Sequence, residues 1–147
     1  MKIKYFAYGS NMDLSQMTKR CENNFKLLGV AKLKGWEFYI NNQSKANIAI
    51  DITNSNSVVY GLLFEVNKTA LGSLDRYEGY NKVPKTYDRD LENIKFKEDE
   101  IEAWVYIDKR NLETGKSDST DYLERIIQAS KSLNFPSKYI THLESFL

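Results

Sequence analysis

The sequence contains few of the side chains on which several common kinds of catalytic site depend. It has one cysteine and one histidine in 147 residues, so it cannot form an internal disulfide and offers no zinc-type ligand set. A Ser-His-Asp triad would have to use His142, and no Gly-x-Ser-x-Gly pattern accompanies it. Cys21 follows Arg20, but we expect it to be a small buried hydrophobic residue rather than a reactive thiol. An enzyme built on this chain would therefore rely on a carboxylate, hydroxyls and backbone dipoles.

The sequence also lacks an excess of charge and a long apolar run. Its 21 basic and 20 acidic residues give a net charge of +1, which provides no basic surface for nucleic acid or an anionic membrane. No run approaches the roughly 20 apolar residues that span a bilayer, and the first residues predict a strand rather than a signal peptide. We therefore expect no nucleic-acid partner, no membrane association and a cytoplasmic location, which the single cysteine also suits.

The chain does have enough apolar and aromatic residues for one core. Hydrophobic residues make up 41% and aromatic residues 13%, including ten tyrosines. The length favours a single domain over residues 1–147, and no internal repeat or linker divides it. Tyrosines can line a pocket, although core and surface positions in a β-rich domain are the more common place for each of them.

Apolar stretches predict most of the chain as β-strands. The continuous stretch 58–64 indicates a central strand buried on both faces. In residues 48–52, three isoleucines alternate with Ala49 and Asp51, which is the pattern of a half-buried strand. The other expected strands are residues 3–8, 25–33, 36–41, 86–96 and 101–107.

Capping residues predict helices between and after these strands. Asp13 with Gln16 resembles a capping box that opens a short helix, and Asn67 can cap a helix in the middle of the chain. Two further helices are expected at the C-terminal end, one beginning at Asp121 with Glu124 and one at residue 136. This order predicts an α+β fold, a single domain with a mixed, strongly curved, barrel-like sheet and about three principal helices.

The loop after the first strand is one candidate site. It consists of Tyr8, Gly9, Ser10 and Asn11. A glycine allows the backbone to approach a ligand closely, and successive N–H groups beside a helix N-terminus can bind a carboxylate or phosphate. A plain strand-to-helix turn has the same pattern and is the more common structure. No Gly-Lys-Ser/Thr follows, so this is not a Walker loop.

Glu78 is the second candidate, because the middle helix is expected to end there before Gly79. A carboxylate at that end faces the negative pole of the helix dipole, which disfavours its ionised form and raises its pKa. A raised pKa suits a general base that works near neutral pH. An exposed glutamate before a glycine that ends a helix is nevertheless a very common arrangement.

Three segments together resemble the γ-glutamylcyclotransferase-like family, also called the AIG2-like family. They are residues 5–12 (YFAYGSNM), residues 74–79 (LDRYEG) and residues 135–139 (FPSKY). Their order and spacing are similar to the family pattern from about Tyr5 to Leu143. The combination is more specific than either the Tyr-Gly-Ser-Asn loop or the Glu-Gly pair alone. The resemblance implies a small mixed α/β barrel-like domain with a cavity.

The same resemblance implies roles for individual residues. Glu78 takes the place of the family's catalytic glutamate, residues 8–11 match its substrate loop, and Tyr87, Tyr106 and Tyr122 match its cavity tyrosines. The implied reaction is an internal aminolysis of a small-molecule γ-glutamyl compound, which gives 5-oxoproline and a free amino acid or amine. Because the nucleophile belongs to the substrate, neither a protein nucleophile nor a cofactor is implied.

Two alternatives remain open from the sequence. One is a γ-glutamylamine cyclotransferase, or an enzyme that removes a γ-glutamyl protecting group from a metabolite, with the same site and a different leaving amine. The other is a non-catalytic binding module on the same fold, although such a module would have no need of Glu78 at its position. The sequence predicts neither the leaving amine nor the oligomeric state.

Overall fold

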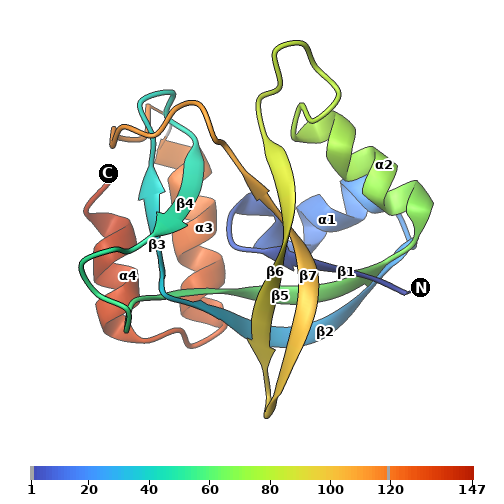
Figure 1. Cartoon of the computed structure of the whole chain (residues 1–147), viewed down its shortest axis with the longest axis horizontal. Coiled ribbons are helices and arrows are strands. Elements are labelled where there is room, and N and C mark those ends of the chain that lie inside the picture. Colours follow the sequence, from blue (N-terminus) through green and yellow to red (C-terminus); the bar gives the residue numbers. More distant parts are fainter. Residues whose placement is uncertain (1, 119) are drawn as a thin grey trace.

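The computed structural model describes residues 2–118 and 120–147, which form a closed β-barrel, a small second sheet and four α-helices (Figure 1). The barrel strands are β1 (Ile3–Ala7), β2 (Phe25–Lys34), β5 (Val58–Val66), β6 (Asp88–Phe96) and β7 (Asp99–Ile107). The second sheet pairs β3 (Trp36–Ile40) with β4 (Ala46–Ile50). The helices are η1 (Ser10–Met12, a 3-10 turn), α1 (Leu14–Cys21), α2 (Lys68–Tyr77), α3 (Thr120–Ser132) and α4 (Ser137–Glu144).

The barrel has the strand order β1-β5-β2-β6-β7 and closes where β7 pairs with β1. This last pair is parallel, through Tyr5 and Trp104, whereas the other barrel pairs are antiparallel. The sheet is therefore mixed, as expected. β5 lies between β1 and β2, and its residues 62–64 are at most 1% exposed, which confirms the central strand. A Cβ on Gly61 would overlap the carbonyl oxygen of Ala7, so glycine allows β1 and β5 to approach.

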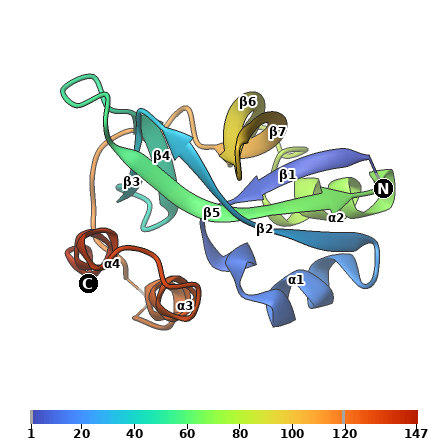
Figure 2. The ribbon, with the colours of Figure 1, turned by 90° about the horizontal axis from the view of Figure 1, so that it is seen from below.

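The helices cover the barrel unequally. Figure 2 shows α1, α3 and α4 on one side of β2 and β5, with the β6–β7 hairpin on the other side. The three principal helices expected are α2, α3 and α4, and the short helix expected after Asp13 is α1, which buries Met17 and Cys21 in the core. Asp13 does cap α1, since its carboxylate accepts a hydrogen bond from the Ser15 amide at 3.0 Å. Gln16 does not complete a capping box, because its side chain bonds to the loop before the helix.

Two sequence-based expectations about element boundaries are wrong. Ile50 is 62% exposed and Ile52 is 92% exposed, so the half-buried pattern ends after Ile48. The reason is that β4 ends at Ile50 and Asp51 begins a polar turn, in which its carboxylate accepts a hydrogen bond from the Thr53 amide at 3.1 Å. At the other end of the chain, α3 already includes residue 120, so Asp121 lies in its first turn rather than capping it. Position 119, which precedes the helix, lies outside the described residues.

Candidate active site

A cavity of about 190 Å³ lies where the barrel meets α1, α2, α3 and the connection between β3 and β4. Its walls come from segments that are far apart in the sequence, from residue 5 to residue 122. All eight residues that the sequence pointed to line this cavity: Tyr8, Gly9, Ser10, Asn11, Glu78, Tyr87, Tyr106 and Tyr122. Their chemical roles stay predictions, but the fold brings them together.

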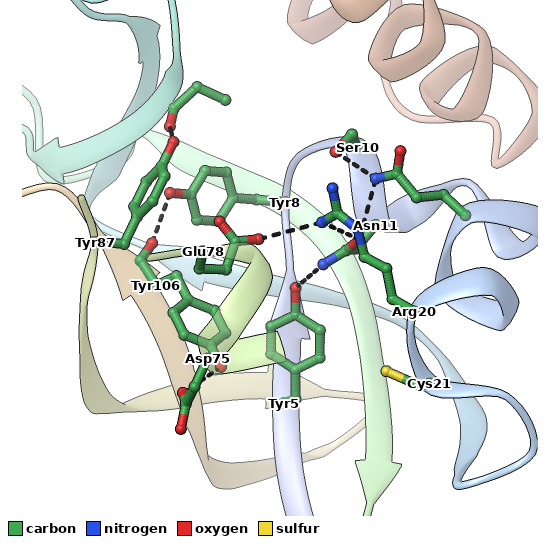
Figure 3. A network of polar contacts seen from close by, with 12 residues as sticks. Tyr5, Tyr8, Ser10, Asn11, Arg20, Cys21, Asp75, Glu78, Tyr87 and Tyr106 are labelled. Atoms are coloured by element: carbon green, nitrogen blue, oxygen red, sulfur yellow. Dashed lines mark hydrogen bonds and ion pairs between the residues drawn. The ribbon is translucent and has the colours of Figure 1, made fainter. Parts of the chain in front are cut away.

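Glu78 reaches the cavity because of the way in which α2 ends. It is the C-cap residue of α2, and its amide donates to the Leu74 carbonyl oxygen at 2.8 Å. Gly79 then takes a positive φ of 69°, and a Cβ there would lie 2.6 Å from Oγ1 of Thr86. Glycine therefore lets the chain turn sharply and fold back, so that the Tyr87 amide donates to the Glu78 carbonyl oxygen at 3.2 Å. Figure 3 shows the Glu78 carboxylate among Tyr8, Tyr106 and Arg20.

Burial changes the acid strength of Glu78. Its side chain is 18% exposed, and removal of the carboxyl from water raises its pKa to about 7. The positive charges of Arg20 and Lys45 act in the opposite direction. The sequence predicted a raised pKa from the position at a helix end, whereas burial is the main cause here. Near neutral pH the carboxyl is present in both its protonated and its ionised form, as a group that both takes and returns a proton requires.

The loop beside Glu78 is held by the one-turn helix η1. Gly9 precedes η1 with φ −115° and ψ −141°, and the first backbone bond of the turn runs from the Met12 amide to the Gly9 carbonyl oxygen at 3.0 Å. The amides of Ser10 and Asn11 therefore precede the first hydrogen bond within the turn. The Asn11 side chain is only 3% exposed; its Nδ2 donates to the Tyr5 hydroxyl at 2.8 Å. Asn11 thus directs its side chain to protein partners.

Two of the cavity tyrosines connect the barrel to α2. The hydroxyl of Tyr8 donates to the carbonyl oxygen of Tyr106 at 2.6 Å. The hydroxyl of Tyr106 in turn donates to Asp75 at 2.8 Å, one helical turn before Glu78 (Figure 3). Asp75 also pairs with Arg89 of β6 at 3.0 Å. These bonds fix the end of α2, and with it Glu78, against the barrel.

Two further cavity tyrosines, Tyr87 and Tyr122, hold one residue of the small sheet. The hydroxyl of Tyr87 donates to the Ala46 carbonyl oxygen at 2.5 Å, and the Ala46 amide donates to the hydroxyl of Tyr122 at 3.1 Å. Burial raises the pKa of Tyr122 to about 12 and the pKa of Tyr87 well above its usual range. Both tyrosines are therefore neutral hydroxyls at physiological pH.

The cavity also contains cations that the sequence did not reveal as site residues. Arg20, Lys45 and Lys82 line it, whereas Glu78 is the one acidic residue among its described lining residues. The charged walls therefore favour an anionic ligand. Arg20 lies on α1, and its contact with Glu78 at the end of α2 joins distant segments, which no local pattern predicts. Lys45 and Lys82 lie in loops, where no periodic pattern predicts proximity to the site.

Cys21 and His142 lie outside the cavity lining. Cys21 is 2% exposed, and burial raises the pKa of its thiol to about 11, as suits a core residue. His142 lies on α4 with Nε2 at 2.7 Å from the Phe38 carbonyl oxygen. Within residues 2–118 and 120–147, no group of three or more His, Cys, Asp or Glu side chains could hold a metal ion. In the same part of the chain no helix is long and apolar enough to cross a membrane.

The chain matches a known protein family over most of its length and shares its fold with solved structures. The model of the family described as "Gamma-glutamyl cyclotransferase, AIG2-like" matches residues 5–124. No curated protein sequence gives a significant match to the chain. The fold is similar to a solved structure named "Gamma-glutamyl cyclotransferase", with a TM-score of 0.82, 24% identity, and coverage of 99% of this chain and 88% of that chain.

Two further solved structures share the fold. An uncharacterised protein from Homo sapiens has a TM-score of 0.81 and 24% identity, over 99% of this chain and 88% of that chain. YkqA from Bacillus subtilis has a TM-score of 0.78 and 20% identity, over 98% of this chain and 55% of that chain. At these identities the structural likeness shows a common fold.

Proposed function

Because the chain belongs to the γ-glutamyl cyclotransferase, AIG2-like family, we propose that its cavity converts a γ-glutamyl compound into 5-oxoproline and a free amino acid or amine. The observation that carries this proposal is Glu78, a buried carboxyl with a pKa of about 7 in a cavity that is otherwise lined by hydroxyls and cations. Such a group can act as a base and as an acid at the same pH.

In the proposed reaction the α-amine of the γ-glutamyl group attacks the side-chain carbonyl carbon of the same group. Ionised Glu78 removes a proton from the α-ammonium and makes the amine nucleophilic. A ring C–N bond then forms, and the original amide C–N bond breaks as Glu78 returns the proton to the leaving nitrogen. The ring nitrogen passes its second proton to the leaving amine, which departs as an ammonium. Because both reacting groups belong to one substrate, binding it in a folded conformation supplies much of the rate acceleration.

The loop and the lysines would hold the substrate for this step. A γ-glutamyl group carries an α-carboxylate, which matches the positive charges of Lys45 and Lys82 in the cavity wall. The amides of Ser10 and Asn11 are hydrogen-bond donors beside the cavity and would bind the α-carboxylate or the developing oxyanion. The neutral hydroxyls of the cavity tyrosines add polar surface without adding charge.

Incubation with a panel of γ-glutamyl compounds tests the proposal. The panel contains γ-glutamyl amino acids, γ-glutamylamines and a γ-glutamyl-protected metabolite, and 5-oxoproline is measured by mass spectrometry. We expect 5-oxoproline from at least one compound with the wild-type protein and almost none with Glu78→Gln. Binding of these compounds without any 5-oxoproline would instead identify a non-catalytic module. The panel also identifies the leaving group that the enzyme prefers.

A further inference from the structure

Arg20 is the cation that lies nearest to the Glu78 carboxylate. Its NH1 atom is 3.6 Å from Oε1 of Glu78, and the two side chains are 21% and 18% exposed, so water screens this pair only partly. A separation of 3.6 Å is longer than a charge-assisted hydrogen bond. The charge of Arg20 therefore stabilises the ionised carboxylate without occupying the oxygen that must accept the substrate's proton.

The position of Arg20 is fixed by contacts that contain no acidic group. The same NH1 atom donates to Oδ1 of Asn11 at 3.0 Å, and this oxygen also accepts a hydrogen bond from Nε2 of Gln16 at 3.2 Å. The guanidinium lies over the ring of Tyr77, 4.7 Å from its centroid. An amide oxygen and an aromatic face do not neutralise Arg20, so its charge acts on Glu78, which it contacts in Figure 3.

The contacts behind Asn11 extend to the neighbouring helix. Nε2 of Gln16 donates to Oγ of Ser10 at 2.6 Å, and Oε1 of Gln16 accepts from NH1 of Arg125 on α3 at 2.6 Å. Asn11 itself is anchored by its bond to the Tyr5 hydroxyl. A buried asparagine held on both sides is a rigid support for the arginine that it contacts.

Several other groups influence Glu78, but none of them duplicates Arg20. Lys45 lies in the exposed connection between β3 and β4, and Lys82 is exposed in the loop after α2, so water screens both lysines more strongly. The remaining titratable groups of the described cavity wall are tyrosine hydroxyls. One is Tyr77 of α2, whose ring lies under Arg20, and burial keeps the others neutral: Tyr5 of β1, Tyr8, Tyr87, Tyr106 of β7 and Tyr122 of α3.

We propose that Arg20 is a positioning residue that holds the Glu78 carboxylate in place and stabilises its ionised form, and that the Asn11 side chain serves this arginine rather than the substrate. The proposal rests on the proposed function, in which ionised Glu78 is the base. It changes the role of Asn11, which the sequence placed among the substrate-binding residues. The backbone N–H group of Asn11 remains available to the ligand, whereas the side-chain amide is occupied by Tyr5, Gln16 and Arg20.

The test measures the protonation of Glu78 directly, by NMR titration of the 13C-labelled side-chain carboxyl, and in parallel the pH dependence of kcat/KM. Removal of an opposite charge at this distance raises a carboxyl pKa by about 1–3. We therefore expect Arg20→Gln to move both midpoints upward by at least about one pH unit. At pH 7 kcat/KM should fall by about fivefold or more, and it should recover at higher pH because the base is still present.

Three variants complete the experiment. Arg20→Lys keeps the charge and should restore most of the wild-type midpoint. Asn11→Ala should move the midpoint in the same direction as Arg20→Gln but less far, because the arginine stays and loses its support. Arg76→Gln is the matched control, since Arg76 is an exposed arginine of α2 that contacts Ser73 outside the cavity, and its midpoint should equal that of the wild type.

The outcomes separate this proposal from the proposed function. A folded Arg20→Gln protein whose Glu78 midpoint stays within about 0.3 pH unit of the wild type would overturn the role of Arg20. A rise in KM at every pH with no change of midpoint would also overturn it, because Arg20 would then bind substrate. An unchanged midpoint in Asn11→Ala would overturn the role of Asn11. The NMR titration needs no turnover, so it gives an answer even if the protein forms no 5-oxoproline.

Discussion

Replacement of Glu78 by glutamine separates the chemistry of the site from its shape. Glutamine has nearly the same volume and can still accept a hydrogen bond, so the cavity and its walls should be preserved. It cannot take a proton, so the α-ammonium of the substrate would stay protonated and non-nucleophilic. Loss of a general base typically costs about 10²–10⁴-fold in rate. Because Glu78 also returns the proton to the leaving nitrogen, we expect a loss in kcat at or beyond the upper end of this range.

The same substitution should make the protein more stable. The pKa of Glu78 is raised from 4.5 to about 7 by folding, so the folded protein binds this proton more tightly than the unfolded chain. Ionisation of Glu78 therefore lowers the free energy of unfolding. The loss grows as the pH rises from about 4.5 to about 7 and is constant above pH 7. At about 1.4 kcal/mol for each pKa unit, this shift corresponds to about 3.5 kcal/mol, and solvent screening of the partly exposed side chain lowers the cost to about 3 kcal/mol.

Glutamine carries no charge and avoids this cost. The stability of Glu78→Gln should therefore match that of the wild type below pH 4.5 and exceed it above pH 7. For a chain of this size, about 3 kcal/mol corresponds to a rise in Tm of about 6–12 °C. A variant that is more stable and nearly inactive is the expected result for a charged group buried for catalysis.

The measurement combines melting curves at pH 4.5, 6 and 8 with the 5-oxoproline assay. Circular dichroism spectra of the variant check that the fold is kept. Formation of 5-oxoproline by Glu78→Gln within a factor of ten of the wild type would refute the base mechanism. If the Tm of Glu78→Gln at pH 8 is at or below that of the wild type, the argument that burial of ionised Glu78 lowers the free energy of unfolding is refuted.

Three other predictions follow from the same geometry. The wild-type kcat/KM should rise with pH through a midpoint near 7 as Glu78 ionises, and a midpoint near the ordinary glutamate value of 4.5 would contradict the burial argument. Cys21→Ser and His142→Gln should keep most of the activity, with stability losses of about 1 kcal/mol, whereas a thousandfold drop in either would indicate nucleophilic catalysis. Gly79→Ala should lower both stability, by about 1–3 kcal/mol, and kcat, because φ is 69° and the new Cβ would meet Thr86. Its control is Gly72→Ala in α2, where a Cβ meets nothing within 4 Å, so activity should be unchanged and stability slightly higher in thermal melts of both variants.

The sequence predicted the parts of this fold whose signal is local. The apolar run at residues 58–64 identifies β5 because a strand covered on both faces needs apolar residues at nearly every position. Asp13 and Asn67 are both helix caps in the structure, since the capping interaction involves neighbouring residues alone. The alternation of isoleucines failed beyond Ile48 because burial depends on whether another layer covers the strand, which the strand itself does not encode.

In the candidate site, too, the features that depend on contacts between distant segments could not be predicted from local sequence patterns. Tyr8 and Glu78 could be identified together only by resemblance to a family, because their contact depends on the closure of the barrel. The contact between Arg20 and Glu78 joins α1 to the end of α2, and no local pattern predicts it. The sequence also does not show that burial raises the pKa of Glu78, because the groups that surround this carboxyl come from distant segments.

The two tyrosines that contact Ala46 determine which hydrogen-bonding groups this part of the cavity wall presents. The hydroxyl of Tyr87 covers the Ala46 carbonyl oxygen, and the hydroxyl of Tyr122 covers the Ala46 amide. Loss of one oxygen atom, by phenylalanine at position 87, would present an uncovered acceptor to a ligand, whereas phenylalanine at position 122 would present an uncovered donor. Loss of a single oxygen atom from either ring would thus change whether this part of the wall offers a hydrogen-bond acceptor or a donor, while the shape of the cavity stays almost the same.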